Sequence, residues 1–371
     1  MMNSVSFYDY MQSALYGSAG YYMTERERFG KQGDFYTSVQ VSPLFAYLWS
    51  SFVGDFFAAK SKDVVVTELG CGDGGFAVPL LDGLCHDALV EDRMIRYLGV
   101  DLSAVARSRA KERVEQWLLL QDSRIRDRIQ VRFISSLMDL PEQDIAAYQG
   151  AFVFGNEWLD ALPVHCVRIT KESVMELFVG SKRPFDAEAG PYRSRQLATW
   201  FALSTDPIVL DYANRYLVPH ALRRPGALIA EAQTEMAFAI SAICDVLDPI
   251  GFAFVDYGGY TEDVLSIDRP RGTLRAYQHH ELVDDFLDRS GSCDITYDVD
   301  FSVVHDVVSQ LGYTCDRLQR QGAFFLHLPR VMECFTWFAA NHKEATNAFK
   351  QLVLPGAMGD RFTVFLARKD L

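Results

Sequence analysis

One acid and three glycines stand at every second position of the segment ELGCGDG, as Glu68, Gly70, Gly72 and Gly74. They follow the run DVVV at 63–66, which predicts a buried parallel strand because a strand covered on both faces is continuously apolar. Glycine allows a tight turn and a close approach of a ligand to the backbone, since a side chain would occupy the ligand's space. The spacing therefore predicts a ligand-binding turn at the end of a strand.

A second acid, Asp101, ends the strand predicted at 94–101 in MIRYLGVD. A carboxylate there can accept hydrogen bonds from both hydroxyls of a ribose. A dinucleotide would need the spacing G-x-G-x-x-G to place its pyrophosphate on a helix N-terminus, whereas the spacing here is E-x-G-x-G-x-G. S-adenosylmethionine (SAM) has no phosphate, so the glycines can make room for its adenosine and methionine parts while Glu68 helps to hold the methionine end. The glycine segment and Asp101 together favour SAM as the ligand. The alternative is an ordinary strand-to-helix turn whose glycines serve packing.

Three polar residues follow another predicted strand in the segment GNEWLDALPVH. Asn156 and Glu157 end the strand, and Asp160 stands three residues after Glu157, so that the two carboxylates could face one site. Two carboxylates suit a cationic acceptor such as a guanidinium. Methyl transfer is an in-line displacement, for which a carboxylate can orient the acceptor nitrogen and take its proton. The alternative is a helix cap at Glu157 and a turn at Asp160.

Three further segments carry polar residues at predicted turns or strand ends. GDFYTS, at 33–38, is a polar glycine turn that forms either a lid over the ligand, through Asp34 and Thr37, or a plain loop. VDYGGY ends another predicted strand and places Asp256 and Tyr257 at the same edge. GTLRAYQHH brings an arginine, a tyrosine and two histidines to a second binding surface, although a single histidine is more often a surface or core hydrogen-bonder than a base.

The elements that position these residues alternate between strand and helix. Strands are predicted at 63–70, 94–101, 129–135 and 150–157, and a helix at 103–118. Such alternation predicts an α/β fold with a parallel, doubly wound sheet and right-handed crossovers. The ligand site of such a sheet lies at the carboxyl ends of its strands.

The domain organisation follows from where this alternation begins and breaks. We expect a helical, aromatic N-terminal arm with the lid motif at 1–60, and a domain at 61–371 that carries the catalytic residues. At 165 the segment HCVRITKESVMELFVG alternates with period two around a polar turn and predicts an antiparallel hairpin, so we interpret 165–225 as an inserted lobe that caps the sheet. The alternation then resumes with a helix at 230–247, a strand at 251–258 and a final strand at 361–369.

Composition narrows the class of protein. A hydrophobic content of 49% indicates a globular chain, and a net charge of -13 argues against a surface that coats nucleic acid and favours a basic partner. The seven cysteines lie far apart without any C-x-x-C, which is typical of a reducing compartment rather than of a disulfide framework or a metal site. We find no signal core, transit peptide or apolar run of about eighteen residues, so we expect a cytoplasmic protein that does not enter a membrane. The early aromatic clusters FYDYM and GYY are more often core than the surface of a homodimer.

Together these segments resemble the MidA-like SAM-dependent methyltransferases, a family whose mitochondrial members are complex I assembly factors that act as protein arginine methyltransferases. The resemblance runs along almost the whole chain, and several of its motifs together are highly specific. It rests on FYDYMQSALYGSAGYY, GDFYTSVQVSPLF, ELGCGDG, GNEWLDALPVH, VDYG, GTLRAYQHH, DITYDVDF and LPGAMGDRF.

The resemblance implies a Rossmann-like α/β fold, with a seven-strand class I SAM-dependent methyltransferase core, an N-terminal helical arm and an inserted lobe, and SAM as the cofactor. By position, the family's cofactor segment matches Glu68, Gly70, Gly72 and Asp101, its N-terminal motif matches Gly33, Asp34, Thr37 and Ser38, and its acidic edge motif matches Asn156, Glu157 and Asp160. The chain departs from the family pattern at Val39, Pro79 and Trp158, and Trp158 would sit near the acceptor.

The leading hypothesis is an enzyme that transfers a methyl group from SAM to an arginine of a partner protein. A non-catalytic assembly factor that keeps SAM as a structural ligand is one rival, although intact glycines beside intact carboxylates favour the enzyme. A small-molecule methyltransferase stays open as well. A nicotinamide-dependent oxidoreductase is disfavoured because neither G-x-G-x-x-G nor a hydride-transfer constellation occurs.

Overall fold

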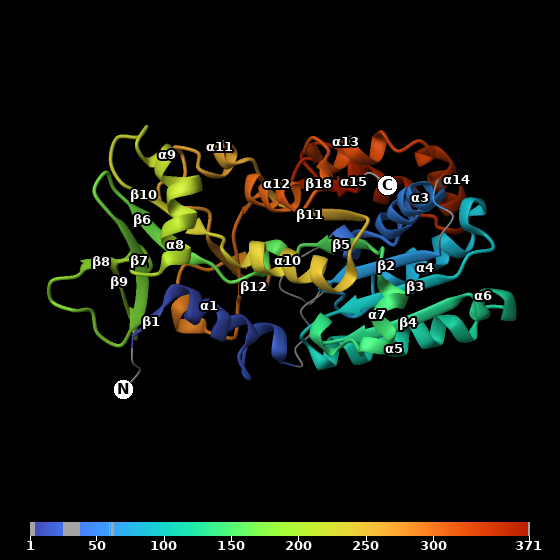
Figure 1. Ribbon diagram of the computed structural model, residues 1–371, viewed down its shortest axis with the longest axis horizontal. Helices are drawn as coiled ribbons and strands as arrows, with labels where there is room; N and C mark the ends of the chain where they lie inside the picture. The colour runs from blue at the N-terminus through green and yellow to red at the C-terminus, as the bar shows by residue number, and fades with distance from the viewer. Residues whose placement is uncertain (1–3, 25–37, 59, 61–62, 370–371) are drawn as a thin grey trace. The chain divides into compact units, whose positions relative to one another are not determined.

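The computed structural model describes residues 4–24, 38–58, 60 and 63–369. It divides the chain into two compact units, and Figure 1 labels many of their elements. Unit 1 comprises Met1–Phe35, Leu159–Ser241 and Tyr257–Val307, and unit 2 comprises Tyr36–Trp158, Ala242–Asp256 and Val308–Leu371.

These bounds differ from the arm at 1–60 and the lobe at 165–225 that the sequence predicts. The strand β1 (Val5–Ser6) pairs with β7 (Val174–Gly180), which joins the start of the chain to the hairpin region in unit 1. The helix α3 (Leu44–Ala58), by contrast, belongs to unit 2. Pairings between segments that lie more than 150 residues apart in the chain leave no mark on local periodicity, so the pattern alone could not place these bounds.

Unit 2 is built on the predicted parallel sheet. The strand order is β16-β18-β11-β5-β2-β3-β4. The strands are β2 (Val64–Leu69), β3 (Ile95–Val100), β4 (Ile129–Ile134), β5 (Phe152–Asn156), β11 (Gly251–Gly259), β16 (Thr314–Cys315) and β18 (Phe362–Arg368). The pairs β2–β3, β3–β4, β2–β5 and β5–β11 are all parallel, which confirms the prediction for these strands. The pair β16–β18 at the edge is antiparallel, so the sheet is mixed.

The strand order reverses its direction at one point of this sheet. From β2 the chain continues through β3 to β4 on one side, and then returns to β5 and β11 on the other side. The topological switch point therefore lies at the carboxyl ends of the neighbouring strands β2 and β5. Open α/β sheets bind their ligands at such a point.

Helices connect and cover the strands of unit 2. They are α2 (Ser38–Val41), α3, α4 (Ala77–Cys85), α5 (Ala104–Leu119), α6 (Ser123–Asp127), α7 (Glu142–Tyr148), α13 (Gln321–Leu326), α14 (Val331–Asn341) and α15 (Ala345–Val353). Helix α5 begins after Ser103, whose hydroxyl accepts a hydrogen bond from the backbone N–H of Ala106, as an N-cap residue does. The core beneath them is aromatic, since Trp49, Phe76 and Phe154 are all buried and the last two rings stack at 4.4 Å.

Unit 1 contains two antiparallel sheets. The first has the order β10-β6-β7-β9-β8, with β1 beside β7, and the second has the order β13-β12-β14. The predicted hairpin is confirmed, because β6 (His165–Ile169) pairs antiparallel with β7. The remaining strands of these two sheets are β8 (Glu188–Ala189), β9 (Ala198–Leu203), β10 (Leu228–Ala232), β12 (Arg275–Gln278), β13 (Glu281–Leu282) and β14 (Asp294–Thr296). Strand β15 (Val299–Asp300) instead pairs in parallel with the end of β11.

The helix predicted at 230–247 starts later than expected. Leu228–Ala232 form the strand β10, which pairs antiparallel with β6, and helix α10 spans Glu235–Leu247. Short apolar runs fit a strand and a helix equally well, so the partner strand decides between them.

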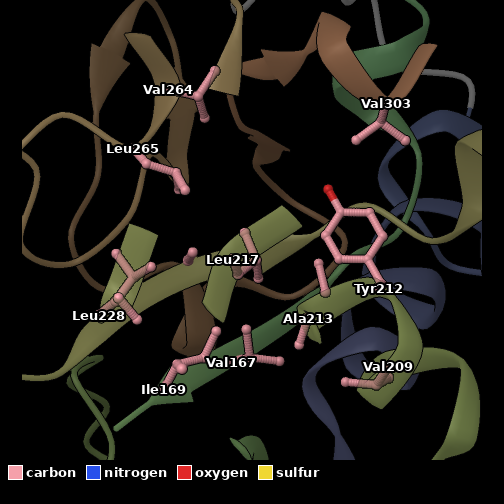
Figure 2. Packing of buried hydrophobic residues seen from close by; sticks show 13 residues of the cluster. Val167, Ile169, Val209, Tyr212, Ala213, Leu217, Leu228, Val264, Leu265 and Val303 are labelled. Carbon is pink, nitrogen blue, oxygen red and sulfur yellow. The ribbon is translucent and has the colours of Figure 1, made fainter. Parts of the chain in front are cut away.

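A hydrophobic cluster packs the first sheet of unit 1 against a helical segment. Figure 2 shows Val167 and Ile169 of β6 directed toward the side chains of Leu217 and Leu228. The segment is helix α8 (Pro207–Tyr212), the π-helix η5 (Ala213–Leu217) and helix α9 (Val218–Ala221). Pro219 explains the wide π turn, because its ring clashes with a carbonyl of the preceding turn and it has no N–H to donate.

No helix in the described part of the chain is long and apolar enough to cross a membrane. The same residues contain no group of three or more histidine, cysteine or acidic side chains placed to hold a metal ion. The seven cysteines all lie in the described part of the chain, and none of them is in a disulfide there.

Candidate functional site

The turn that follows β2 needs its glycines for their backbone conformation. Gly70, Gly72 and Gly74 have φ values of 66°, 52° and 79°, in the left-handed region that other residues rarely adopt. The backbone N–H of Gly70 donates to the carbonyl of Val100 at 2.8 Å, which fixes the turn beside the end of β3. The predicted tight turn is thus confirmed.

The space beside two of these glycines belongs to the protein itself. A Cβ atom on Gly70 would lie 3.0 Å from Cδ1 of Trp158, and one on Gly74 would lie 3.0 Å from the Cα atom of Ala110 in α5. The expectation that a ligand takes the side-chain space of all three glycines is therefore wrong at these two positions. Gly70 accommodates an indole ring, and Gly74 allows helix α5 to pack closely against the turn.

Asp101 ties this turn to the end of β3. Its Oδ2 accepts a hydrogen bond from the backbone N–H of Gly72 at 2.9 Å, and its Oδ1 accepts one from the backbone N–H of Ser103 at 2.8 Å. The carboxylate therefore stands at the carboxyl edge of the sheet, directly beside the glycine turn, where a ligand of the switch point would lie. Its binding of a ribose stays a prediction.

Glu68 lies inside unit 2 rather than at its surface. Its side chain is 4% exposed, and its carboxylate accepts a hydrogen bond from the hydroxyl of Tyr97 on β3. Burial raises the pKa of Glu68 well above its ordinary value, the bond from Tyr97 opposes the shift, and Asp101 adds to it. The predicted contact with the methionine part of a ligand stays a prediction.

Tyr97 is a partner that the sequence interpretation missed. The signal is a tyrosine within a buried strand, because a buried hydroxyl needs a hydrogen-bond partner.

The carboxyl end of β5 brings Asn156 and Glu157 together with Ser38. Oε1 of Glu157 accepts hydrogen bonds from Nδ2 of Asn156 at 3.0 Å and from the backbone N–H of Ser38 at 3.3 Å. Glu157 has a φ of 50°, and its own N–H donates to the carbonyl of Val255 on β11 at 2.8 Å. A non-glycine residue in this conformation costs roughly 1–2 kcal/mol, and such strain concentrates at functional sites.

Asn156 also carries an unsatisfied polar atom at the same edge. Its Oδ1 is buried and has no hydrogen-bond partner within the described part of the chain. An acceptor of this kind is costly unless something donates to it. A ligand with an N–H or O–H group at the switch point would remove this cost, so the residues present fit a polar ligand there.

Ser38 begins helix α2 and links the acidic edge to the C-terminal part of unit 2. Its hydroxyl is fully buried and donates to Oε1 of Gln321 at 3.0 Å. Gln321 in turn donates to the carbonyl of Leu352, and no motif of the sequence pointed to it. Gly33, Asp34 and Thr37, the other predicted residues of this motif, lie outside the described residues.

Asp160 belongs to unit 1, in the short helix η4 (Leu159–Ala161). Its side chain is buried, and Oδ2 accepts a hydrogen bond from the hydroxyl of Thr296 on β14 at 2.7 Å. Its pairing with Glu157 toward one acceptor stays a prediction.

The predicted second binding surface is held by buried acids of unit 1. Arg275 forms an ion pair with Asp298 at 2.5 Å, and its guanidinium lies over the ring of Tyr257 at 5.2 Å. His279 and His280 form the hairpin turn between β12 and β13 with φ values of 53° and 64°. Both histidines are exposed at this tip, which fits the expectation of a surface residue rather than a base.

Comparison with known proteins decides the class. A family model for S-adenosyl-L-methionine-dependent methyltransferases matches residues 49–319. The chain belongs to this family. Its cofactor is therefore SAM, and its fold is the class I methyltransferase fold that the sequence indicated.

Relatives of this methyltransferase span nearly the whole chain. The mitochondrial protein arginine methyltransferase NDUFAF7 homolog of Drosophila melanogaster is 24% identical over 97% of this chain and 80% of its own length. The human protein arginine methyltransferase NDUFAF7 is 24% identical over 96% of this chain and 78% of its own length.

A solved structure agrees with the fold. The crystal structure of a superfamily member from Burkholderia thailandensis bound to S-adenosyl-homocysteine is 25% identical, with a TM-score of 0.77 over 99% of this chain and 88% of that chain.

The residues at the switch point fit the cofactor of the family. Asp101 offers a carboxylate, the glycine turn brings backbone to the carboxyl edge, and Asn156 offers a buried acceptor that has no partner among the described residues. Each can bind a part of SAM by hydrogen bonding, since its ribose, adenine and ammonium groups all carry donors. We therefore predict that the cofactor site of this methyltransferase lies between the carboxyl ends of β2, β3 and β5.

Proposed function

We propose that this methyltransferase transfers the methyl group of SAM to a guanidinium nitrogen of an arginine in a partner protein. The observation that carries the proposal is Glu157, a carboxylate held in a strained conformation at the carboxyl edge of β5, beside the switch point. The names of the relatives in fly and human, both protein arginine methyltransferases, support the same acceptor.

The carboxylate of Glu157 suits the chemistry of such an acceptor. A guanidinium is protonated at every physiological pH and has no free lone pair on its nitrogen. When bound, SAM supplies an electrophilic methyl group on a cationic sulfur. Glu157 binds the guanidinium N–H groups, aligns one nitrogen in line with the methyl group and accepts the proton that this nitrogen loses as its bond to carbon forms.

Asn156 and Ser38 orient this carboxylate. Both donate to Oε1 of Glu157, so the side chain is held from two sides before a substrate arrives. Preorganisation of this kind avoids the cost of ordering the side chain in the transition state.

The partner protein is expected to carry its arginine in a basic segment. The methyltransferase has a net charge of -13, which attracts cationic chains and speeds their association at low salt. Action in the cytoplasm is part of the same proposal.

The test is methyl transfer from isotope-labelled SAM to proteins of the source cell, followed by mass spectrometry of the labelled peptides. We expect label on arginine side chains, and we expect Glu157→Gln to bind S-adenosyl-homocysteine as the wild type does while transfer falls by about 10²–10⁴-fold. Full transfer by that variant would overturn the role of Glu157. Label on a small molecule, or cofactor binding without any transfer, would overturn the protein arginine proposal.

A further inference from the structure

Trp158 occupies an unusual place in unit 2. It follows the strained Glu157, and its indole ring lies against the backbone of Gly70, the first glycine of the cofactor turn. A Cβ atom on Gly70 would come within 3.0 Å of Cδ1 and 3.7 Å of Cγ of this ring. The ring therefore bridges the segment after β5 and the segment after β2.

The supports of this ring come from the same sheet. The ring of Phe254 on β11 stacks with it at 6.2 Å between centroids and an interplanar angle of 16°. Gly155 makes the approach possible, since a Cβ atom there would lie 3.0 Å from Phe254 and 3.6 Å from Cβ of Trp158. One side of the indole is thus packed on the protein, yet the residue is only partly buried.

The position coincides with the switch point between β2 and β5. The two strands beside this point are each followed by a residue next to the ring. Gly70, which follows β2, touches the indole, and Glu157, which follows β5, precedes Trp158 in the chain. A partly exposed indole at this point faces the place where a ligand binds in such sheets.

We propose that Trp158 is a cofactor-binding residue whose ring recognises the positive charge of SAM. An aromatic face attracts a cation, and the neighbouring carboxylate of Glu157 adds to the negative potential there. That the positive sulfur of SAM lies near Trp158 rests on the proposed function. If the methyl group of SAM points toward an acceptor bound by Glu157, the sulfur that carries it lies near the next residue, Trp158. The sequence alone predicts only that Trp158 sits near the acceptor.

The test is the affinity for two ligands that differ in charge, SAM and its neutral product S-adenosyl-homocysteine, measured by calorimetry on wild type and on Trp158→Leu and Trp158→Phe. We expect Trp158→Leu to weaken SAM about tenfold and S-adenosyl-homocysteine by no more than about threefold. The phenylalanine variant keeps an aromatic face and should recover most of the loss. Equal losses for the two ligands would overturn the proposal.

Tryptophan fluorescence gives a second measurement that does not depend on turnover. We expect S-adenosyl-homocysteine to change the emission of the wild type, and Trp158→Phe to abolish most of that change. Trp117→Phe is the matched control, because Trp117 lies fourteen residues along α5 from its N-cap Ser103, about 20 Å from the carboxyl edge. An unchanged signal in Trp158→Phe would overturn the proposal.

The two proposals fail separately. If Trp158→Leu changes the relative affinity for SAM and S-adenosyl-homocysteine, but the wild-type enzyme yields no methylated arginine, only the proposed acceptor is overturned. Methylated arginine with unchanged preference would overturn the role of Trp158 alone.

Discussion

Each unit contains a loop in which a glycine and an acid hold the backbone in place, but the two loops differ in what surrounds them. In unit 2, Asp101 binds the backbone N–H groups of Gly72 and Ser103 at the carboxyl edge of the parallel sheet. In unit 1, Glu231 on β10 binds the backbone N–H groups of Thr273 and Leu274. In the sequence the two loops look alike, because each combines a segment that contains glycine with a carboxylate far away in the chain.

The surroundings separate a binding loop from a structural one. Glu231 is 3% exposed and accepts a further hydrogen bond from the hydroxyl of Thr273 at 3.0 Å. A Cβ atom on Gly272 would lie 2.2 Å from Oε1 of Glu231, so this glycine makes room for the acid itself. Asp101, by contrast, is partly exposed beside a switch point. Partial exposure at a strand's carboxyl end, rather than the residue types, therefore distinguishes the predicted ligand loop from the structural one.

The largest expected effect is the loss of the buried anchor in unit 1. Replacing Glu231 with alanine leaves the N–H groups of Thr273 and Leu274 and the hydroxyl of Thr273 without their acceptor. We expect the free energy of unfolding to fall by about 3–5 kcal/mol, measured by chemical denaturation, because each orphaned buried donor costs about 1–3 kcal/mol.

Glu231→Gln is the matched control, since it keeps one acceptor and the shape of the side chain. It should lose clearly less stability, and the folded fraction of both variants should bind S-adenosyl-homocysteine as the wild type does. A change below about 1 kcal/mol in Glu231→Ala would mean that water or a shifted loop replaces the carboxylate.

A second buried acid of unit 1 should make stability depend on pH. Asp300 is 1% exposed, and burial raises its pKa from 3.8 to about 6, against the opposing bonds from Thr261 and Ser302. The folded state therefore favours the protonated acid, and this contribution is full below about pH 4 and lost as the pH rises through about 6.

The change in the free energy of unfolding across that window is at most about 3 kcal/mol, because a pKa difference of 1 between folded and unfolded states corresponds to about 1.36 kcal/mol. Asp300→Asn removes the titrating group, so the stability difference between variant and wild type should shift in favour of the variant from pH 4 to 6. Denaturation curves at several pH values check this, and parallel curves for the two proteins would contradict it.

The counterpart in unit 2 should affect binding more than folding. Asp101→Ala removes the carboxylate that accepts hydrogen bonds from the backbone N–H groups of Gly72 and Ser103. Asp101 is partly exposed, so water can take the place of the carboxylate. We expect SAM affinity to fall by about 1–3 kcal/mol, which is roughly 5–150-fold, and stability to change by only about 1 kcal/mol. Calorimetry with Asp101→Asn as the control measures the change in affinity, denaturation measures the change in stability, and an unchanged affinity would remove Asp101 from the cofactor site.

Most of the sheet of unit 2 could be predicted from the sequence, because its strands alternate with helices along the chain, β2 begins as an apolar run, and its turn carries glycines at regular spacing. The short strand at Leu228–Ala232 could not, since its partner β6 lies some sixty residues earlier in the chain. The candidate site followed the same rule. The pattern predicts Asp101 and Glu157 because they stand at strand ends. Tyr97 is signalled only by its place in a buried strand, and Gln321 acts through a contact across the fold that leaves no local signal.

The glycine turn shows where pattern reasoning stops. Spacing identified Gly70 as a special position, but not that Trp158 fills the space beside it. Gly70→Ala adds a methyl group 3.0 Å from the indole and also strains a backbone with a φ of 66°. We expect a loss of about 2–3 kcal/mol in the free energy of unfolding, of which roughly 1–2 kcal/mol is backbone strain.

Gly312→Ala separates the two contributions, because Gly312 has a φ of 87° and, apart from its chain neighbours, no described residue has an atom within 4 Å of an added Cβ. This control in the same unit should lose the strain energy only, so the difference of about 1 kcal/mol between the two variants measures the contact with Trp158. Adding Trp158→Leu should remove that difference while leaving the strain. If Gly70→Ala and Gly312→Ala lose equal stability, the indole moves aside freely, and its position on the cofactor turn is not fixed by packing.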